Sequence, residues 1–200
     1  MMERAGEERC ALVDRALPGA GARAWWDAVL VIAGAALVAL FARVEIPLVP
    51  VPITGQTLAV LWVAALLGAR RGAWAMMTYL AAGAMGFPIF AGGGAGPATL
   101  LGPTAGYLVG FLLAAYVVGT LCEVGWDRRV GSALLAMAAG TALITACGVL
   151  WLAPFVGWDR VFVVGVRPFL IGDALKIGLA MLLLPLGRRL VGSPTRLGPW

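Results

Sequence analysis

The sequence contains no histidine, and its three cysteines, Cys10, Cys122 and Cys147, form no C-x-x-C motif. Without an imidazole side chain, the chain can build neither a histidine-ligated zinc site nor a Ser-His-Asp triad or Cys-His dyad. Lysine is nearly absent too, because Lys176 is the only one. We therefore expect no metal and no cofactor in this protein.

Charged residues are also scarce: they make up 12% of the 200 residues, whereas 62% are hydrophobic. A soluble domain carries about 25% charged residues. Because so few polar side chains cannot cover a surface that faces water, lipid must solvate much of the chain. The composition predicts an integral membrane protein and excludes a cytosolic enzyme, a nucleic-acid-binding protein and a secreted disulfide scaffold. The net charge of +5 then concerns orientation in the membrane.

Six apolar stretches approach the length of about 20 residues that a helix needs to cross a bilayer. They lie within residues 25–42, 46–68, 72–87, 105–125, 130–153 and 168–187. In the second stretch, helix is expected only from about Gln56, because Pro47, Pro50 and Pro52 precede it. We predict an all-α bundle of six membrane helices at residues 24–190, with cytoplasmic tails at 1–23 and 191–200.

The cations support an orientation, because positive charge is retained on the cytoplasmic side of a membrane. Eleven of the 15 lysines and arginines fall on one side of the predicted bundle: Arg4, Arg9, Arg15, Arg23, Arg70, Arg71, Arg128, Arg129, Arg188, Arg189 and Arg196. The opposite side has only Arg43, Arg160 and Arg167. Both termini are therefore predicted to be cytoplasmic.

The second and third helices are too short to cross the bilayer alone. Residues 46–55 and 88–103, rich in proline and glycine, are expected to complete these crossings. Irregular backbone at membrane depth is tolerated where protein buries it or where it lines a watery cavity. Both segments lie on the outer side, so the cavity is expected to open outward.

Asp173 and Lys176 lie three residues apart in the sixth stretch, so they share a helix face. An ionisable residue inside the membrane indicates a functional site. The alternative is an ion pair that only ties the bundle together. The pair offers acceptor oxygens beside a cationic donor, which suits a small ligand that has N–H groups and a carbonyl or carboxylate.

Two further segments are candidates for the site. Thr54-Gly55-Gln56-Thr57 follows the prolines; Gln56 is predicted to face the pocket, and the threonines either face it or cap the helix. The glycine run at Gly92, Gly93 and Gly94 allows backbone to approach a ligand or to move as a lid, or it is only a flexible loop. The chain has no G-x-G-x-x-G or Walker A motif, so it does not hydrolyse ATP by that route.

The motifs TGQT, GGG, GPTAGY and GD-x-x-K, in this order, resemble the BioY family, the biotin-binding substrate subunits (S components) of energy-coupling-factor (ECF) transporters. The resemblance implies a six-helix bundle in the bacterial cytoplasmic membrane, both termini inside, with an outward-facing biotin pocket. It implies that Asp173 and Lys176 bind the ligand, with Lys176 on either the ureido carbonyl or the carboxylate. Gln56 and Tyr107 are implied as further contacts, and the Gly92 to Gly94 turn as a closing loop.

The resemblance also implies partners. An A-x-x-x-A seam on the first helix, here Ala35 and Ala39, would dock onto a membrane coupling subunit served by two ATPases, although such spacing also occurs in packing within one chain. Biotin captured outside would cross as the whole subunit topples in the membrane. The other arrangement that the resemblance allows is a solitary transporter, which would be a homo-oligomer.

The sequence leaves three other functions to compare with biotin transport. An S component or small transporter for another vitamin would share the bundle but not GD-x-x-K. An intramembrane aspartyl protease would need a second deep aspartate, and only Asp173 is clearly deep, so no enzyme is expected. A structural protein would have no need of a charged pair inside the membrane.

Overall fold

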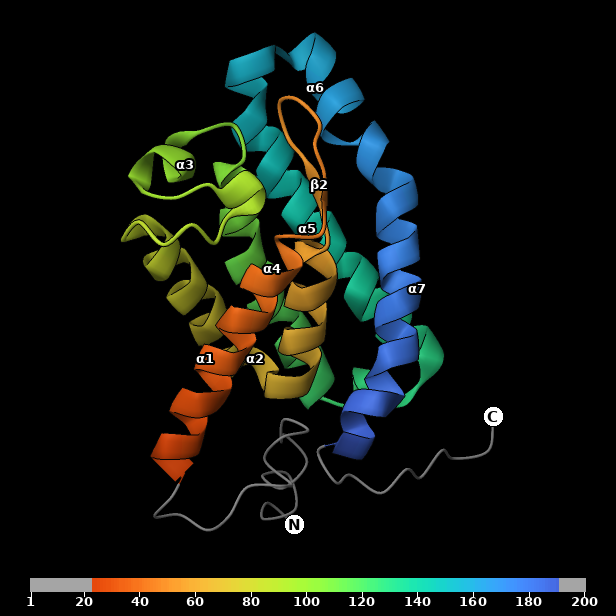
Figure 1. Ribbon diagram of the computed structural model, residues 1–200. Helices are drawn as coiled ribbons and strands as arrows, with labels where there is room; N and C mark the ends of the chain where they lie inside the picture. Colours follow the sequence, from red (N-terminus) through yellow and green to blue (C-terminus); the bar gives the residue numbers. More distant parts are fainter. Residues whose placement is uncertain (1–22, 191–200) are drawn as a thin grey trace.

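The computed structural model describes residues 23–190 as a helical bundle (Figure 1). Its long helices are α1 (Arg23–Phe41), α2 (Gln56–Ala84), α4 (Ala105–Glu123), α5 (Val130–Val156) and α7 (Arg167–Leu190). Shorter elements connect them: α3 (Pro97–Leu101), α6 (Trp158–Gly165), η4 (Ala91–Gly93) and η5 (Trp126–Arg128). Strands β1 (Glu45–Ile46) and β2 (Ile53–Thr54) pair antiparallel. The prediction of a mainly helical bundle is confirmed. Of the predicted tails 1–23 and 191–200, residues 1–22 and 191–200 lie outside the described residues.

The two ends of the bundle differ in what they contain. Figure 1 shows that α1 begins and α7 ends at the same end. The β1–β2 hairpin, α3 and α6 gather at the opposite end. We refer to these as the terminal end and the hairpin end.

Helix α2 reverses direction at Gly68. This residue has φ 80° and ψ −178°, a backbone conformation essentially restricted to glycine. Beyond it the chain runs back along itself: Gln56 Nε2 lies 2.5 Å from Tyr79 Oη, although 23 residues of continuous helix would separate them by about 35 Å. Helix α2 is therefore two antiparallel arms, 56–67 and 69–84, which correspond to the second and third predicted helices.

The reversal is held by the neighbouring helix α4. The Ala69 N–H donates a hydrogen bond to Glu123 Oε1 at 2.8 Å, which satisfies a backbone donor freed by the turn. Helix α4 can come this close because Gly119 has no side chain; a Cβ there would lie 2.4 Å from the Ala69 nitrogen. Arg71 pairs with Asp27 of α1 at 2.8 Å, so the reversal lies at the terminal end.

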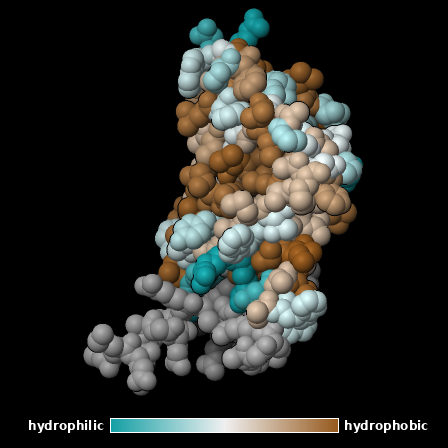
Figure 2. All heavy atoms as spheres, turned by 90° about the vertical axis from the view of Figure 1, so that its left-hand side faces the viewer, coloured by the Kyte–Doolittle hydropathy of each residue, from teal (hydrophilic) through white to brown (hydrophobic). Residues whose placement is uncertain are grey.

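The surface is that of a multi-pass membrane protein. Within residues 23–190, four helices are long and apolar enough to span a bilayer, namely α1, α2, α4 and α5. Figure 2 shows one face of the molecule, on which hydrophobic side chains form a broad band with hydrophilic residues gathered towards its two ends. Helices α2 and α4 are mostly buried, whereas little of α1 is buried.

The structure differs from the sequence prediction at the hairpin end. Helix α5 was expected to stop at Ala153 but continues through Pro154 to Val156, where Gly157, with φ 86°, ends it. Pro154 has no N–H to donate to the carbonyl four residues earlier, and the helix continues for only two residues beyond it. The amphipathic helix α6 follows at once and was not predicted.

We predict that Gly68→Ala destabilises the protein by about 1–3 kcal/mol, because alanine would be strained at this positive φ. Thermal unfolding in mild detergent measures the effect. Gly131→Ala is the matched control, since a Cβ at that position meets nothing within 4 Å. Equal melting temperatures for the two variants would contradict a glycine requirement at the reversal.

Candidate ligand-binding site

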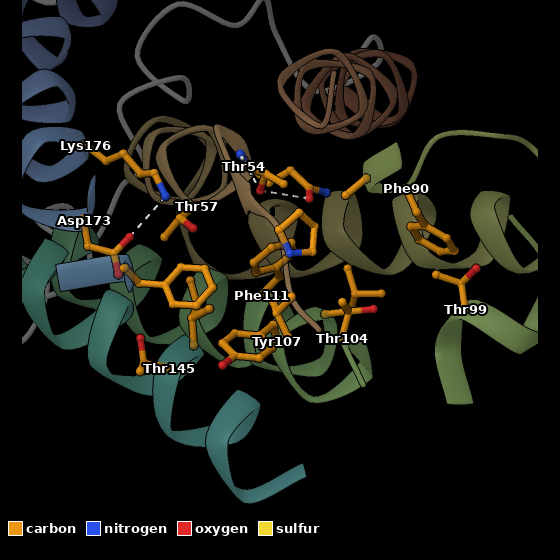
Figure 3. Close-up of a pocket in the computed structure, with 17 residues that line it drawn as sticks. Thr54, Thr57, Phe90, Thr99, Thr104, Tyr107, Phe111, Thr145, Asp173 and Lys176 are labelled. Atoms are coloured by element: carbon orange, nitrogen blue, oxygen red, sulfur yellow. Dashed lines mark hydrogen bonds and ion pairs between the residues drawn. The ribbon is translucent and has the colours of Figure 1, made fainter. Parts of the chain in front are cut away.

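A pocket lies inside the hairpin end of the bundle (Figure 3). It holds about 730 Å³ of space, including the open space at its mouth. Side chains come from strand β2 and the segment before it, from residues 90–104 between α2 and α4, and from helices α2, α4, α5 and α7. The lining residues are Val51, Pro52, Thr54, Gln56, Thr57, Phe90, Ala91, Thr99, Thr104, Tyr107, Leu108, Phe111, Ile144, Thr145, Phe169, Asp173 and Lys176.

Asp173 and Lys176 are the charged residues among those that line the pocket in the described part of the chain. Lys176 Nζ donates to Asp173 Oδ1 at 3.1 Å, and each side chain is only 13% exposed. Both lie in the first half of α7, one helical turn apart on a shared face. The predicted pairing of these two residues is confirmed, and the pair faces the pocket rather than lipid.

Gln56 also lines the pocket, but its side-chain amide already forms hydrogen bonds with other residues of the protein. It is 3% exposed. The Thr54 hydroxyl donates to Gln56 Oε1 at 3.1 Å, Gln56 Nε2 donates to Tyr79 Oη, and the Tyr79 hydroxyl donates to the Ile89 carbonyl at 3.2 Å. Gln56 thus connects strand β2, both arms of α2 and the loop after α2. Thr54 also accepts the Gln56 N–H at 3.3 Å, so one of the two predicted threonine caps is present.

The loop after α2 forms one wall of the pocket through Phe90 rather than through its glycines. Phe90 is 1% exposed and its ring meets that of Tyr79 edge to face, with centroids 5.4 Å apart. The ring fits over Gly83, where a Cβ would collide with it. Phe90 and Ala91 line the pocket, whereas Gly92, Gly93 and Gly94 continue the turn outside the lining.

Two side chains, one in the hairpin and one just before it, bind the backbone of the loop that contains the glycine turn. Glu45 Oε2 accepts the Gly92 N–H at 2.6 Å, and Arg43 Nη2 donates to the Pro88 carbonyl. The hairpin and the glycine turn are therefore linked to each other. A contact between ligand and these glycines stays a prediction, and so does closure of this loop.

Tyr107 lies in the first turn of α4 and faces the pocket. Its hydroxyl donates to the Gly165 carbonyl at 2.8 Å, and its ring packs at 5.8 Å from Phe169. The ring occupies the space over Gly148 of α5, where any side chain would clash with it. Tyr107 offers a ligand its ring and the remaining acceptor capacity of its oxygen.

The sequence analysis did not identify the apolar walls of the pocket. Tyr107, Leu108 and Phe111 share one face of α4, and helical spacing could have grouped them once Tyr107 was a candidate. Phe90 and Phe169 lie in other segments, and only the fold brings them together. Thr57, Thr104 and Thr145 complete the polar lining.

The predicted docking seam on α1 requires a correction. Ala35 is only 7% exposed and belongs to the hydrophobic core, and Ala39 is half-buried against it. Neither alanine therefore presents an open face to a partner. The exposed stripe of α1 runs instead along Ala28, Ile32, Ala36 and Leu40.

An ion pair inside a largely apolar pocket, enclosed by membrane helices, defines a membrane protein that binds a small polar molecule. The family model for the BioY family matches residues 15–193. The chain therefore belongs to the BioY family.

Relatives and a solved structure agree with this family. The chain is 40% identical to the biotin transporter BioY of Thermotoga maritima, over 74% of this chain and 87% of that protein. It is 38% identical to the biotin transporter BioY of Rhizobium etli, over 79% of this chain and 93% of that protein. A crystal structure of the S component for biotin from an ECF-type ABC transporter shares the fold, with a TM-score of 0.74 and 22% identity over 86% of this chain and 94% of that one.

We predict that Tyr79→Phe lowers the free energy of unfolding by about 1–3 kcal/mol, because it removes the donor to Ile89 and leaves the buried Gln56 amide without its acceptor. Thermal unfolding in detergent tests this. Tyr116→Phe, at a tyrosine 54% exposed, is the control and should leave stability unchanged. A Tyr79→Phe protein as stable as the control variant would show that the hydrogen-bond chain contributes nothing.

Proposed function

We propose that this protein takes up biotin as the S component of an ECF-type transporter in a bacterial cytoplasmic membrane, and is not an enzyme. The membrane bundle, the BioY family and relatives named as biotin transporters support the proposal. The observation that carries it is the Asp173–Lys176 pair, whose side chains are each 13% exposed and line the pocket. A membrane protein gains little stability from such a pair, so a ligand that uses it explains why it is there.

The chemistry of the pocket suits biotin. Biotin joins a compact fused ring system to a hydrocarbon chain, with a ureido group at one end and a carboxylate at the other. Phe90, Phe111 and Phe169 provide apolar surface for the rings and the chain, and burial of such surface contributes about 25 cal/mol per Å². Asp173 and Lys176 provide an acceptor and a donor for a polar group.

We propose that the chain crosses the membrane six times, with both termini in the cytoplasm. The crossings would be α1, the two arms of α2, α4, α5 and α7, which run between the terminal and hairpin ends (Figure 1). The turns of the terminal end contain Arg70, Arg71, Arg128 and Arg129, as retention of positive charge inside would require. The pocket, at the hairpin end, would then receive biotin from outside.

We further propose that the exposed stripe of α1 docks onto the transmembrane coupling subunit that two ATPases serve. Ile32 and Leu40 are 61% and 63% exposed, and the small residues Ala28 and Ala36 alternate with them. Small residues let another helix approach closely within a membrane. Toppling of the loaded subunit against that partner would deliver biotin inside.

We predict that Asp173→Asn and Lys176→Met each weaken biotin binding by about 2–5 kcal/mol, because each leaves the remaining charge in the pocket without its partner. Equilibrium binding of labelled biotin to the purified protein measures this. Asp27→Asn breaks the ion pair with Arg71 at the terminal end, away from the pocket, and should leave affinity unchanged. Wild-type affinity in both pocket variants would remove these residues from the site.

We predict that Ala36→Trp leaves biotin binding unchanged but reduces biotin uptake at least about tenfold, since overpacking at a helix contact costs about 1–3 kcal/mol. Uptake is measured in cells that cannot synthesise biotin and that express the coupling subunit and ATPases. Leu135→Trp, on the exposed side of α5, controls for a bulky residue facing lipid. Normal uptake by Ala36→Trp would rule out docking through this stripe.

A further inference from the structure

Three threonine hydroxyls in the pocket have no hydrogen-bond partner within residues 23–190. Thr54 and Thr99 also line the pocket, but their hydroxyls donate to Gln56 Oε1 and to the Ala95 carbonyl. Thr57, Thr104 and Thr145 are half-buried and make no such bond. Their hydroxyls are thus available to a ligand, each as one donor and one acceptor.

Two of these free hydroxyls lie at the charged end of the pocket. Figure 3 shows Thr57 and Thr145 on the side of Asp173 and Lys176, whereas Thr104 lies towards the opposite side with Phe90. They come from different helices, Thr57 from the first turn of α2 and Thr145 from the middle of α5. This end of the pocket therefore has four polar side chains from three helices.

The charge of this end is balanced. Lys176 Nζ is already 3.1 Å from Asp173 Oδ1, so a ligand carboxylate placed on Lys176 would lie beside the aspartate carboxylate and be repelled by it. A neutral group that both donates and accepts hydrogen bonds meets no such repulsion. The pair thus favours the uncharged end of a ligand that has a carboxylate elsewhere.

The hydrogen-bonding groups of the ureido ring match those of the side chains at this end of the pocket. It has two N–H donors and one carbonyl oxygen with two lone pairs. Asp173 has a second oxygen free to accept from one N–H, and Lys176 has two further protons to donate to the carbonyl. The other N–H still needs an acceptor, and the two free threonine hydroxyls can provide it together with a further donor for the carbonyl.

We propose that Thr57 and Thr145 are specificity-determining residues that recognise the ureido ring together with Asp173 and Lys176, while the carboxylate of the ligand lies away from this pair. This inference rests on the proposed function. It assigns the ion pair to the ureido end of biotin, and it makes both hydroxyls part of the recognition of that end.

The experiment compares biotin with biotin methyl ester, which keeps the ureido ring but has no carboxylate. Dissociation constants of the purified wild-type protein, Thr57→Val and Thr145→Val are measured for both ligands. Each valine variant is expected to weaken both ligands equally, by about three- to tenfold, because the lost hydrogen bond is to the shared ring. Thr57→Ser and Thr145→Ser, which keep the hydroxyl, should restore affinity.

Thr120→Val is the control, because the Thr120 hydroxyl donates to the Tyr116 carbonyl outside the pocket and its loss should leave both affinities unchanged. Valine variants that bind both ligands as the wild type does would overturn the assignment. So would variants that weaken biotin but not its methyl ester, since the hydroxyls would then contact the carboxylate. A wild-type protein that binds neither ligand would instead refute the proposed function itself.

Discussion

Within a bilayer, the protein itself must satisfy its backbone N–H and C=O groups, because the hydrocarbon offers no hydrogen bonds. This constraint explains the contacts that hold the irregular parts of the bundle. Glu123 accepts the Ala69 N–H freed where α2 reverses, and Tyr107 donates to the Gly165 carbonyl where α6 ends. These bonds fix the turns between helices, so the pocket between them has a defined shape.

The Asp173–Lys176 pair departs from this constraint at the pocket. Its two charges satisfy each other only in part, since one aspartate oxygen and two lysine protons are left over. Removing charges from water costs several kcal/mol per ion, and mutual attraction repays this only when the other hydrogen-bonding positions are filled. A polar ligand fills these positions. The desolvation free energy that the pair costs without a ligand therefore favours binding of that ligand.

Much of the fold follows from the sequence because lipid demands long apolar runs. The breaks at Gly68, at Arg128 and at the proline-rich segment all coincide with ends of helices. The sequence also pairs Asp173 with Lys176, since their spacing alone sets one helix face. It could not connect Gln56 with Tyr79, because their contact depends on how the chain turns at Gly68. Nor could it orient α1: lipid and protein core are both apolar, so the pattern does not distinguish buried Ala35 from exposed Ala36.

The same hydrogen bonds join the segments on one side of the pocket to each other. The hairpin and the glycine turn are joined through Glu45 and Gly92, and the Gln56–Tyr79 bond ties both to α2. Helix α7, which carries the ion pair, lies on another side of the pocket and packs against α2 and strand β2. A ligand that binds Asp173 and Lys176 while packing against Phe90 therefore bridges the two parts. Binding energy spent on this bridge would hold the two parts together when the ligand is bound.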